Sequence, residues 1–65
     1  MTKIEIMIAL SAGKTVRHRH FTHEETMKLT GRLYEFEDGC LCDINEFWRY
    51  RTEDSWNTDW EIVKE

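Results

Sequence analysis

The shortness of the chain is the feature that most restricts its fold. Ordering 65 residues costs on the order of 100 kcal/mol, and a chain of this size buries only about 60% of its unfolded surface. Domains this small commonly need disulfides, a bound metal or self-association. Cys40 and Cys42 are one residue apart, so a disulfide would close almost no loop, and we expect reduced thiols. We therefore expect one small domain, residues 1–65, that forms a homo-oligomer, either a dimer or a tetramer.

Nothing in the sequence indicates a membrane segment or an export signal. The longest uncharged apolar stretch, Ile6 to Leu10, is far shorter than the roughly 18–20 residues that a transmembrane helix needs. The first residues run directly into an acid-containing segment and lack the apolar region of a signal peptide. We therefore expect a cytoplasmic protein with no membrane partner.

Charge is unevenly distributed along this acidic chain, whose net charge is −4. Residues 1–32 carry six basic and three acidic side chains, whereas residues 33–65 carry three basic and ten acidic ones. The acidic total argues against direct binding of nucleic acid. Lys14, Arg17 and Arg19 form a local basic cluster that suits a small anion, or equally the solvated face of an edge strand. The acidic run of the second half indicates solvated surface or a phosphate-mimicking face; it comprises Glu35, Glu37, Asp38, Asp43 and Glu46.

The residue pattern predicts a short N-terminal helix over residues 2–11. Apolar residues at positions 4, 7, 8 and 10 have helical spacing. Thr2 with Glu5 three residues later is typical of a capping box, and Gly13 suits the left-handed residue that ends a helix. The β-branched content of this segment leaves a strand as the alternative.

Short strands are predicted for most of the remaining chain. Residues 14–21 alternate, with Val16, His18 and His20 on one face. A second extended stretch covers residues 27–36, with Thr30–Gly31 as a candidate interruption. Asp38–Gly39 predicts a hairpin turn, and residues 40–44 form the return strand. Residues 45–59 show no clear periodicity, and a last strand covers residues 60–63. The expected fold class is α+β, with a short N-terminal helix followed by a small antiparallel sheet or SH3-like partial barrel of four to five strands.

Catalytic or metal chemistry is weakly indicated. His-x-His at 18 and 20 and Cys-x-Cys at 40 and 42 would each place two ligands on one strand face, so a zinc site is conceivable. The spacing matches no common zinc module, and no nucleophile elbow or phosphate loop is present. We expect no metal, no cofactor and no enzymatic activity.

Aromatic side chains crowd into the C-terminal third, at Phe47, Trp48, Tyr50, Trp56 and Trp60. Interleaved with arginine, asparagine and aspartate, they suit a nucleotide-like ligand, because rings stack on bases and arginine pairs with phosphate. They equally suit an oligomer interface or the core. Because Trp56 lies in a polar run, we expect it to be the exposed functional ring.

Two terminal segments carry a family resemblance. The segment Ala9–Arg17 (ALSAGKTVR), the aromatic Phe21 and the C-terminal Asp59–Val63 (DWEIV) resemble a family of small phage proteins. That family includes the second type of Thoeris anti-defence protein and some sequences reported as anti-CRISPRs. Here Phe21 replaces the usual tryptophan, and the chain lacks the family's central segment with proline and serine.

The resemblance implies an oligomer that binds cyclic nucleotide-type immune signals between subunits without cleaving them. It implies that Phe21 stacks on a base and that Asn57, Thr58 and Asp59 contact ribose or phosphate oxygens. Lys14 and Arg17 would lie near that pocket. The expected function is therefore sequestration of a cyclic nucleotide or cyclic ADP-ribose-like signal. The alternative is a protein-binding inhibitor of a host defence enzyme.

Overall fold

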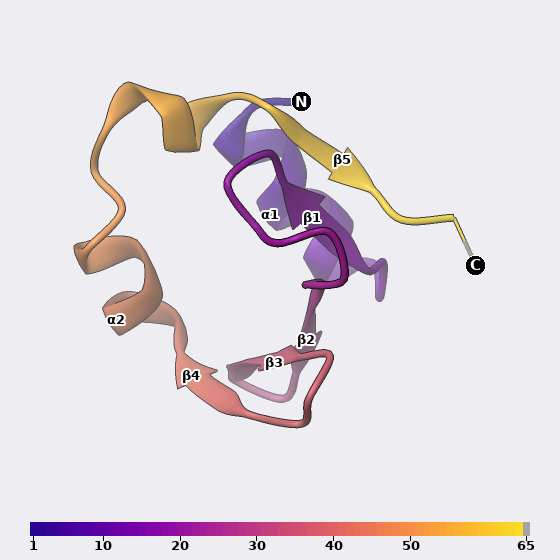
Figure 1. Ribbon diagram of the computed structural model, residues 1–65. Coiled ribbons are helices and arrows are strands. Elements are labelled where there is room, and N and C mark those ends of the chain that lie inside the picture. Colours follow the sequence, from indigo (N-terminus) through magenta and orange to yellow (C-terminus); the bar gives the residue numbers. More distant parts are fainter. Residues whose placement is uncertain (65) are drawn as a thin grey trace.

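The chain forms an N-terminal helix and a five-stranded antiparallel sheet in the computed structural model, which describes residues 1–64 (Figure 1). The predicted α+β class is confirmed. No helix within the described range has the length and apolar character needed to cross a bilayer. The elements in chain order are α1 (Lys3–Ser11), β1 (Val16–His18), β2 (Met27–Thr30), β3 (Leu33–Phe36), β4 (Leu41–Asp43), α2 (Ile44–Arg49), the 3₁₀ helix η1 (Asp54–Asn57) and β5 (Trp60–Ile62).

Both ends of α1 form as the sequence predicts. The Thr2 hydroxyl accepts the Glu5 N–H at 3.2 Å, and the Glu5 carboxylate accepts the Thr2 N–H at 2.9 Å, which completes the capping box. Gly13 has φ +84°. The N–H groups of Gly13 and Lys14 donate back to carbonyls of the last turn at 3.0 Å, which is the Schellman pattern.

The buried side of α1 differs from the side that the apolar spacing indicates. Ile6 is fully buried and Leu10 nearly so, whereas Ile4 is 72% and Ile8 66% exposed. The apolar residues of α1 are distributed around the helix axis, so their spacing alone does not determine which side packs on the sheet. The side of α1 that is buried is set by its packing against β1, β2 and β5.

The sheet has the strand order β4-β3-β2-β1-β5. Strands β2, β3 and β4 follow one another as hairpins, and Gly39, with φ +86°, occupies the predicted turn between β3 and β4. The chain then returns along the far edge of β1, where β5 pairs over three residues. In Figure 1, α2 and η1 carry the chain from β4 across to β5.

Two predicted strand boundaries are wrong. The strand expected over residues 14–21 is limited to Val16–His18, because the Phe21 N–H donates to the His18 carbonyl at 2.9 Å and closes a turn that leaves His20 exposed. The return strand ends at Asp43, whose carboxylate accepts the Glu46 N–H at 3.1 Å and caps α2. The segment without clear periodicity contains α2 and η1. Both helices are too short for a periodic apolar pattern to emerge.

Aromatic residues from the second half of the chain complete the core. A place in the core was one of three interpretations of these residues, beside a ligand site and an oligomer interface. Phe47 and Trp60 are buried, and the half-buried Trp48 donates its indole N–H to the Tyr34 hydroxyl at 2.8 Å. This bond ties α2 to β3. The buried hydrophobic residues are Ile6, Ala9, Leu10, Val16, Phe21, Met27, Tyr34, Phe47 and Trp60.

Candidate functional site

The outward side of the β1–β5 pair carries charged residues of both signs. Arg17 lies opposite Glu61 in the β1–β5 ladder, and Arg19 and Asp59 lie in the segments that adjoin these two strands. Together with Trp60, these residues line a shallow hollow of about 400 Å³. We call this site the β1–β5 hollow; it is lined by Arg17, Arg19, Asp59, Trp60 and Glu61. Its volume falls in the range of small-molecule sites.

Ion pairs position the two arginines of the β1–β5 hollow differently. Arg17 Nε lies 3.1 Å from Glu61 Oε1, and the Arg17 side chain is 28% exposed. Arg19 Nη1 lies 3.9 Å from Asp59 Oδ2, and its side chain is 76% exposed. A guanidinium has five N–H donors. Each arginine therefore has donors beyond the one in its ion pair, and the carboxylates restrict where those donors lie.

Asp59 has a strained backbone. Its φ of +66° is the only positive value at a non-glycine among residues 1–64, and that region costs roughly 1–2 kcal/mol for such a residue. The Arg19 N–H donates to the Asp59 carbonyl at 3.1 Å, which helps to hold the conformation. Strain of this kind concentrates at functional sites, so Asp59 marks the β1–β5 hollow as the candidate site.

A buried histidine holds the preceding loop in place. His18 is fully buried, and its Nε2 lies 2.7 Å from the Ser55 carbonyl and 2.8 Å from the Thr58 carbonyl. Its Nδ1 accepts the His20 N–H at 3.0 Å. Because Nδ1 accepts a hydrogen bond, the proton of the neutral ring belongs on Nε2, where it is shared between the two carbonyls. His18 therefore fastens η1 and the Thr58 turn to β1.

The structure divides the other predicted polar residues between separate surfaces. Lys14 lines a hollow of about 500 Å³ at the opposite end of the β1–β5 pair, together with Lys64. Asn57 and Thr58 are exposed and line a groove beside α1 with a volume of about 630 Å³. Arg17 and Arg19 of the predicted basic cluster line the β1–β5 hollow, as does Asp59, which the family resemblance indicated. Asn57 and Thr58 adjoin it through the chain.

Neither predicted stacking ring is available at the surface. Phe21 is 8% exposed and makes edge contacts with Trp60 and Phe36 in the core. Trp56 is half-buried: the His18 ring stacks on it with 4.2 Å between centroids, and the Arg51 guanidinium lies over it at 5.3 Å. The prediction of an exposed Trp56 is wrong, because η1 turns this ring onto the buried histidine.

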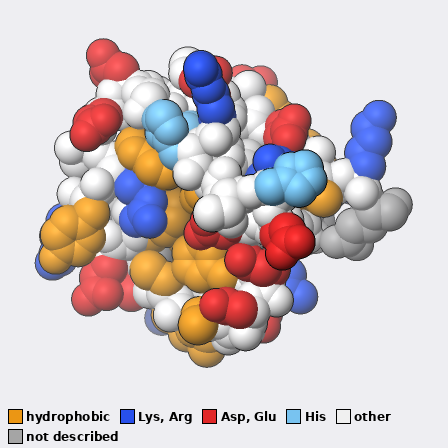
Figure 2. Space-filling model, in the orientation of Figure 1, with side chains coloured by type: hydrophobic (Ala, Val, Ile, Leu, Met, Phe, Trp, Pro, Cys, Tyr) orange, Lys and Arg blue, Asp and Glu red, His pale blue; other side chains and the backbone are white. Residues whose placement is uncertain are grey.

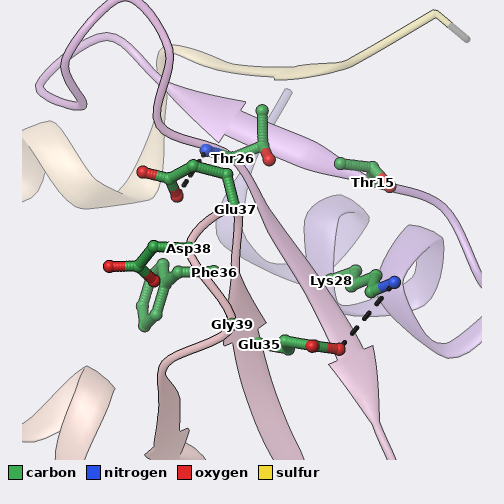
Figure 3. Close-up of a pocket in the computed structure, with 8 residues that line it drawn as sticks. All are labelled: Thr15, Thr26, Lys28, Glu35, Phe36, Glu37, Asp38 and Gly39. Atoms are coloured by element: carbon green, nitrogen blue, oxygen red, sulfur yellow. Dashed lines mark hydrogen bonds and ion pairs between the residues drawn. The ribbon is translucent and has the colours of Figure 1, made fainter.

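An acidic groove lies further along the same outward face of the sheet, between β2 and the β3–β4 turn (Figure 3). It measures about 450 Å³ and carries the carboxylates of Glu35, Glu37 and Asp38. Lys28 Nζ points toward Glu35 and lies 3.8 Å from its Oε1. Figure 2 shows acidic side chains gathered over this part of the molecule.

The histidines and cysteines that suggested a zinc site are not brought together. His18 lies on β1 and Cys42 on β4, and strands β2 and β3 separate them in the sheet. Among residues 1–64, no group of three His, Cys, Asp or Glu side chains is arranged to hold a metal. Hydrogen bonding to Asp38 and the negative charge of that carboxylate raise the pKa of the Cys40 thiol, which disfavours the thiolate.

Two residues that shape the β1–β5 hollow were not among the site residues predicted from the sequence. Glu61 forms the shorter ion pair of the β1–β5 hollow, and His18 fixes the loop that leads to Asp59. The position of Glu61 two residues after Asp59, within the strand predicted for residues 60–63, was a usable signal. The role of His18 had no local signal, since its carbonyl partners lie 37 and 40 residues away.

A comparison with protein-family models, curated proteins and solved structures finds no match to this chain.

Proposed function

We propose that this chain is a phage counter-defence protein that sequesters a cyclic nucleotide or cyclic ADP-ribose-like signal in the host cytoplasm without cleaving it. The β1–β5 hollow carries this proposal, because it combines arginine donors with carboxylate acceptors on one exposed face. The resemblance of the terminal segments to phage anti-defence proteins gives the biological setting.

The mixed charge of the β1–β5 hollow favours a sugar phosphate over a simple anion. Arginine N–H groups donate to phosphate oxygens, whereas carboxylates accept hydrogen bonds from ribose hydroxyls. A hollow with two arginines and two acids gives a bare phosphate little net attraction. A ligand with both phosphates and hydroxyls satisfies both kinds of group. Because Phe21 and Trp56 pack inward, the proposed recognition relies on these polar contacts.

Isothermal titration calorimetry against cyclic dinucleotides and cyclic ADP-ribose tests the proposal. Charge-assisted hydrogen bonds contribute about 1.5–3 kcal/mol each, so Arg17→Gln should weaken binding roughly 10- to 100-fold. Asp59→Asn should weaken binding while keeping the fold, because asparagine tolerates positive φ. Arg32→Gln is the matched control, since Arg32 is exposed in the β2–β3 turn. No heat with any of these nucleotides, or an equal loss in the control, would contradict the proposal.

The alternative function, a protein-binding inhibitor of a host defence enzyme, is favoured by the acidic groove. Three carboxylates along one groove suit a basic protein surface. Affinity capture from a bacterial host lysate separates the two functions. A stoichiometric protein that is lost with a Glu37→Gln/Asp38→Asn variant supports the inhibitor. A small molecule released by heating the captured protein supports sequestration.

A further inference from the structure

Two polar side-chain atoms between α2 and β5 are buried without a hydrogen-bond partner. They are the Nε of Arg51 and the hydroxyl oxygen of Ser55, and they are the only such atoms in residues 1–64. Nearly all buried polar groups in folded proteins are paired, because burial without a partner costs free energy. Both atoms belong to residues 51–58, the orange segment that leads to β5 in Figure 1. We call this segment the η1 loop.

Two further features raise the free energy of the η1 loop in its closed position. The 3₁₀ helix η1 has no side-chain hydrogen bond at its N-cap, Glu53, although such a bond commonly stabilises the start of a helix. The loop ends against Asp59, whose φ of +66° is unfavourable for a residue with a side chain. Local opening of the loop relieves this strain and hydrates both unpaired atoms.

The side chains of His18 and Trp60 hold the η1 loop closed. His18 Nε2 lies 2.7 Å from the Ser55 carbonyl and 2.8 Å from the Thr58 carbonyl. The Trp60 indole N–H donates to the Trp56 carbonyl at 2.9 Å. All three bonds end on carbonyls of the loop, so they break together when the loop moves away from β1 and β5. The loop therefore has the features of a segment that opens as one unit.

We propose that the η1 loop is a gate, which opens while the rest of the domain stays folded and which places Asp59 in the β1–β5 hollow when it closes. Thr58 and Asp59 are consecutive, so breaking the bond between His18 and the Thr58 carbonyl also releases Asp59 from its position 3.9 Å from Arg19. A ligand that contacts Asp59 then binds the closed form and shifts the population toward it. This link to the ligand rests on the proposed function, whereas the opening does not.

Hydrogen exchange of the full chain without nucleotide, followed by NMR, tests the opening. Two protons report on the η1 loop: the Trp56 amide, which donates to the Glu53 carbonyl at 3.0 Å, and the Trp60 indole N–H, which donates to the Trp56 carbonyl. We expect both to be protected at least about tenfold less than the amides that join β2 to β3, because those exchange only when the domain unfolds. Equal protection of the loop and the strands would overturn the gate.

The variant Ser55→Ala tests the cause of the opening. It removes the unpaired hydroxyl and keeps the Ser55 carbonyl that His18 bonds, so the closed loop becomes more stable and both reporter protons should exchange roughly 10-fold more slowly. Ser11→Ala is the matched control: the exposed Ser11 hydroxyl donates to the Met7 carbonyl at 3.0 Å on α1, and its loss should leave both reporters unchanged. Unchanged or faster exchange in Ser55→Ala would overturn the proposal.

Adding cyclic ADP-ribose or cyclic dinucleotides to the same samples separates the gate from the proposed function. A ligand that binds only the closed form, at about 100 times its Kd, slows exchange of the two reporters about 100-fold. Binding that leaves their exchange unchanged supports sequestration and overturns the link between the η1 loop and the β1–β5 hollow. Local opening with no binding of any nucleotide supports the opening and overturns both sequestration and that link.

Discussion

At the residue scale, the least replaceable side chain is polar. His18 is fully buried, yet both ring nitrogens have partners, so its burial leaves no polar atom unsatisfied. Its ring also stacks on Trp56 at 4.2 Å and contacts the edge of Trp60 at 4.7 Å. One residue thus combines the packing of an aromatic ring with the bonds that hold the loop before β5.

We predict that His18→Phe destabilises the domain even though the ring volume is retained. The substitution leaves the Ser55 and Thr58 carbonyls and the His20 N–H without their partner. A typical hydrogen bond contributes about 0.5–1.5 kcal/mol, so we expect the loss of three to cost about 3 kcal/mol. Urea denaturation measures it. His23→Ala, at an exposed position, should change stability by less than about 0.5 kcal/mol, and an equal loss there would contradict this interpretation.

At the element scale, hydrogen bonds to carboxylates fix both an end of a helix and a turn. Glu5 accepts the Thr2 N–H in the capping box, and Asp38 accepts the Cys40 N–H at 3.0 Å in the β3–β4 turn. In each case the backbone hydrogen bond is the largest influence and lowers the pKa of the carboxyl in the folded chain. Both elements are therefore weakened when these groups are protonated.

The sign of the resulting pH dependence follows from these lowered pKa values. A carboxyl whose pKa is lower in the folded than in the unfolded chain binds fewer protons when folded, so its stabilisation is present above the unfolded pKa. That stabilisation is lost as the pH falls from about 5 through the folded pKa. We predict that the urea midpoint falls over this range, and that Glu5→Gln or Asp38→Asn makes the fall shallower. A pH dependence unchanged in both variants would contradict this explanation.

At the scale of the whole molecule, the fold closes a small core with aromatic residues and leaves an apolar helix side uncovered. The nine buried hydrophobic residues come from α1, β1, β2, β3, α2, β5 and the turn at Phe21. Helix α2 supplies Phe47, and η1 packs the half-buried Trp56 against this core. The apolar side chains of Ile4, Met7 and Ile8 on α1 remain at the surface. A domain with so little interior has the most to gain from association.

If the chain forms the expected homo-oligomer through the exposed apolar side of α1, its melting temperature depends on protein concentration. Association stabilises the folded state by mass action, so the midpoint should rise by about 5 °C for each tenfold increase in wild-type concentration. Ile8→Lys should melt at one temperature regardless of concentration. Differential scanning calorimetry over such a series measures both. A concentration-dependent midpoint in Ile8→Lys would assign the association to a different surface.

The sequence by itself determined the features whose partners are close along the chain. The capping box of Thr2 and Glu5, the Schellman turn at Gly13 and the hairpin at Gly39 each depend on hydrogen bonds or backbone conformations within six residues. Together with the alternating strand segments, these were enough to predict the α+β class. Of the β1–β5 hollow, the basic cluster supplied Arg17 and Arg19, and the family resemblance supplied Asp59.

Only the tertiary structure decided which side of each element is buried. An all-round apolar helix such as α1 has several sides that can pack, and the sheet selected Ile6 over Ile4. Trp56 reads as exposed in its polar surroundings, yet it stacks on His18, 38 residues earlier in the chain. The physical reason is the same in each case: burial is a competition between surfaces, and the competing surfaces meet only after strands distant in sequence have paired.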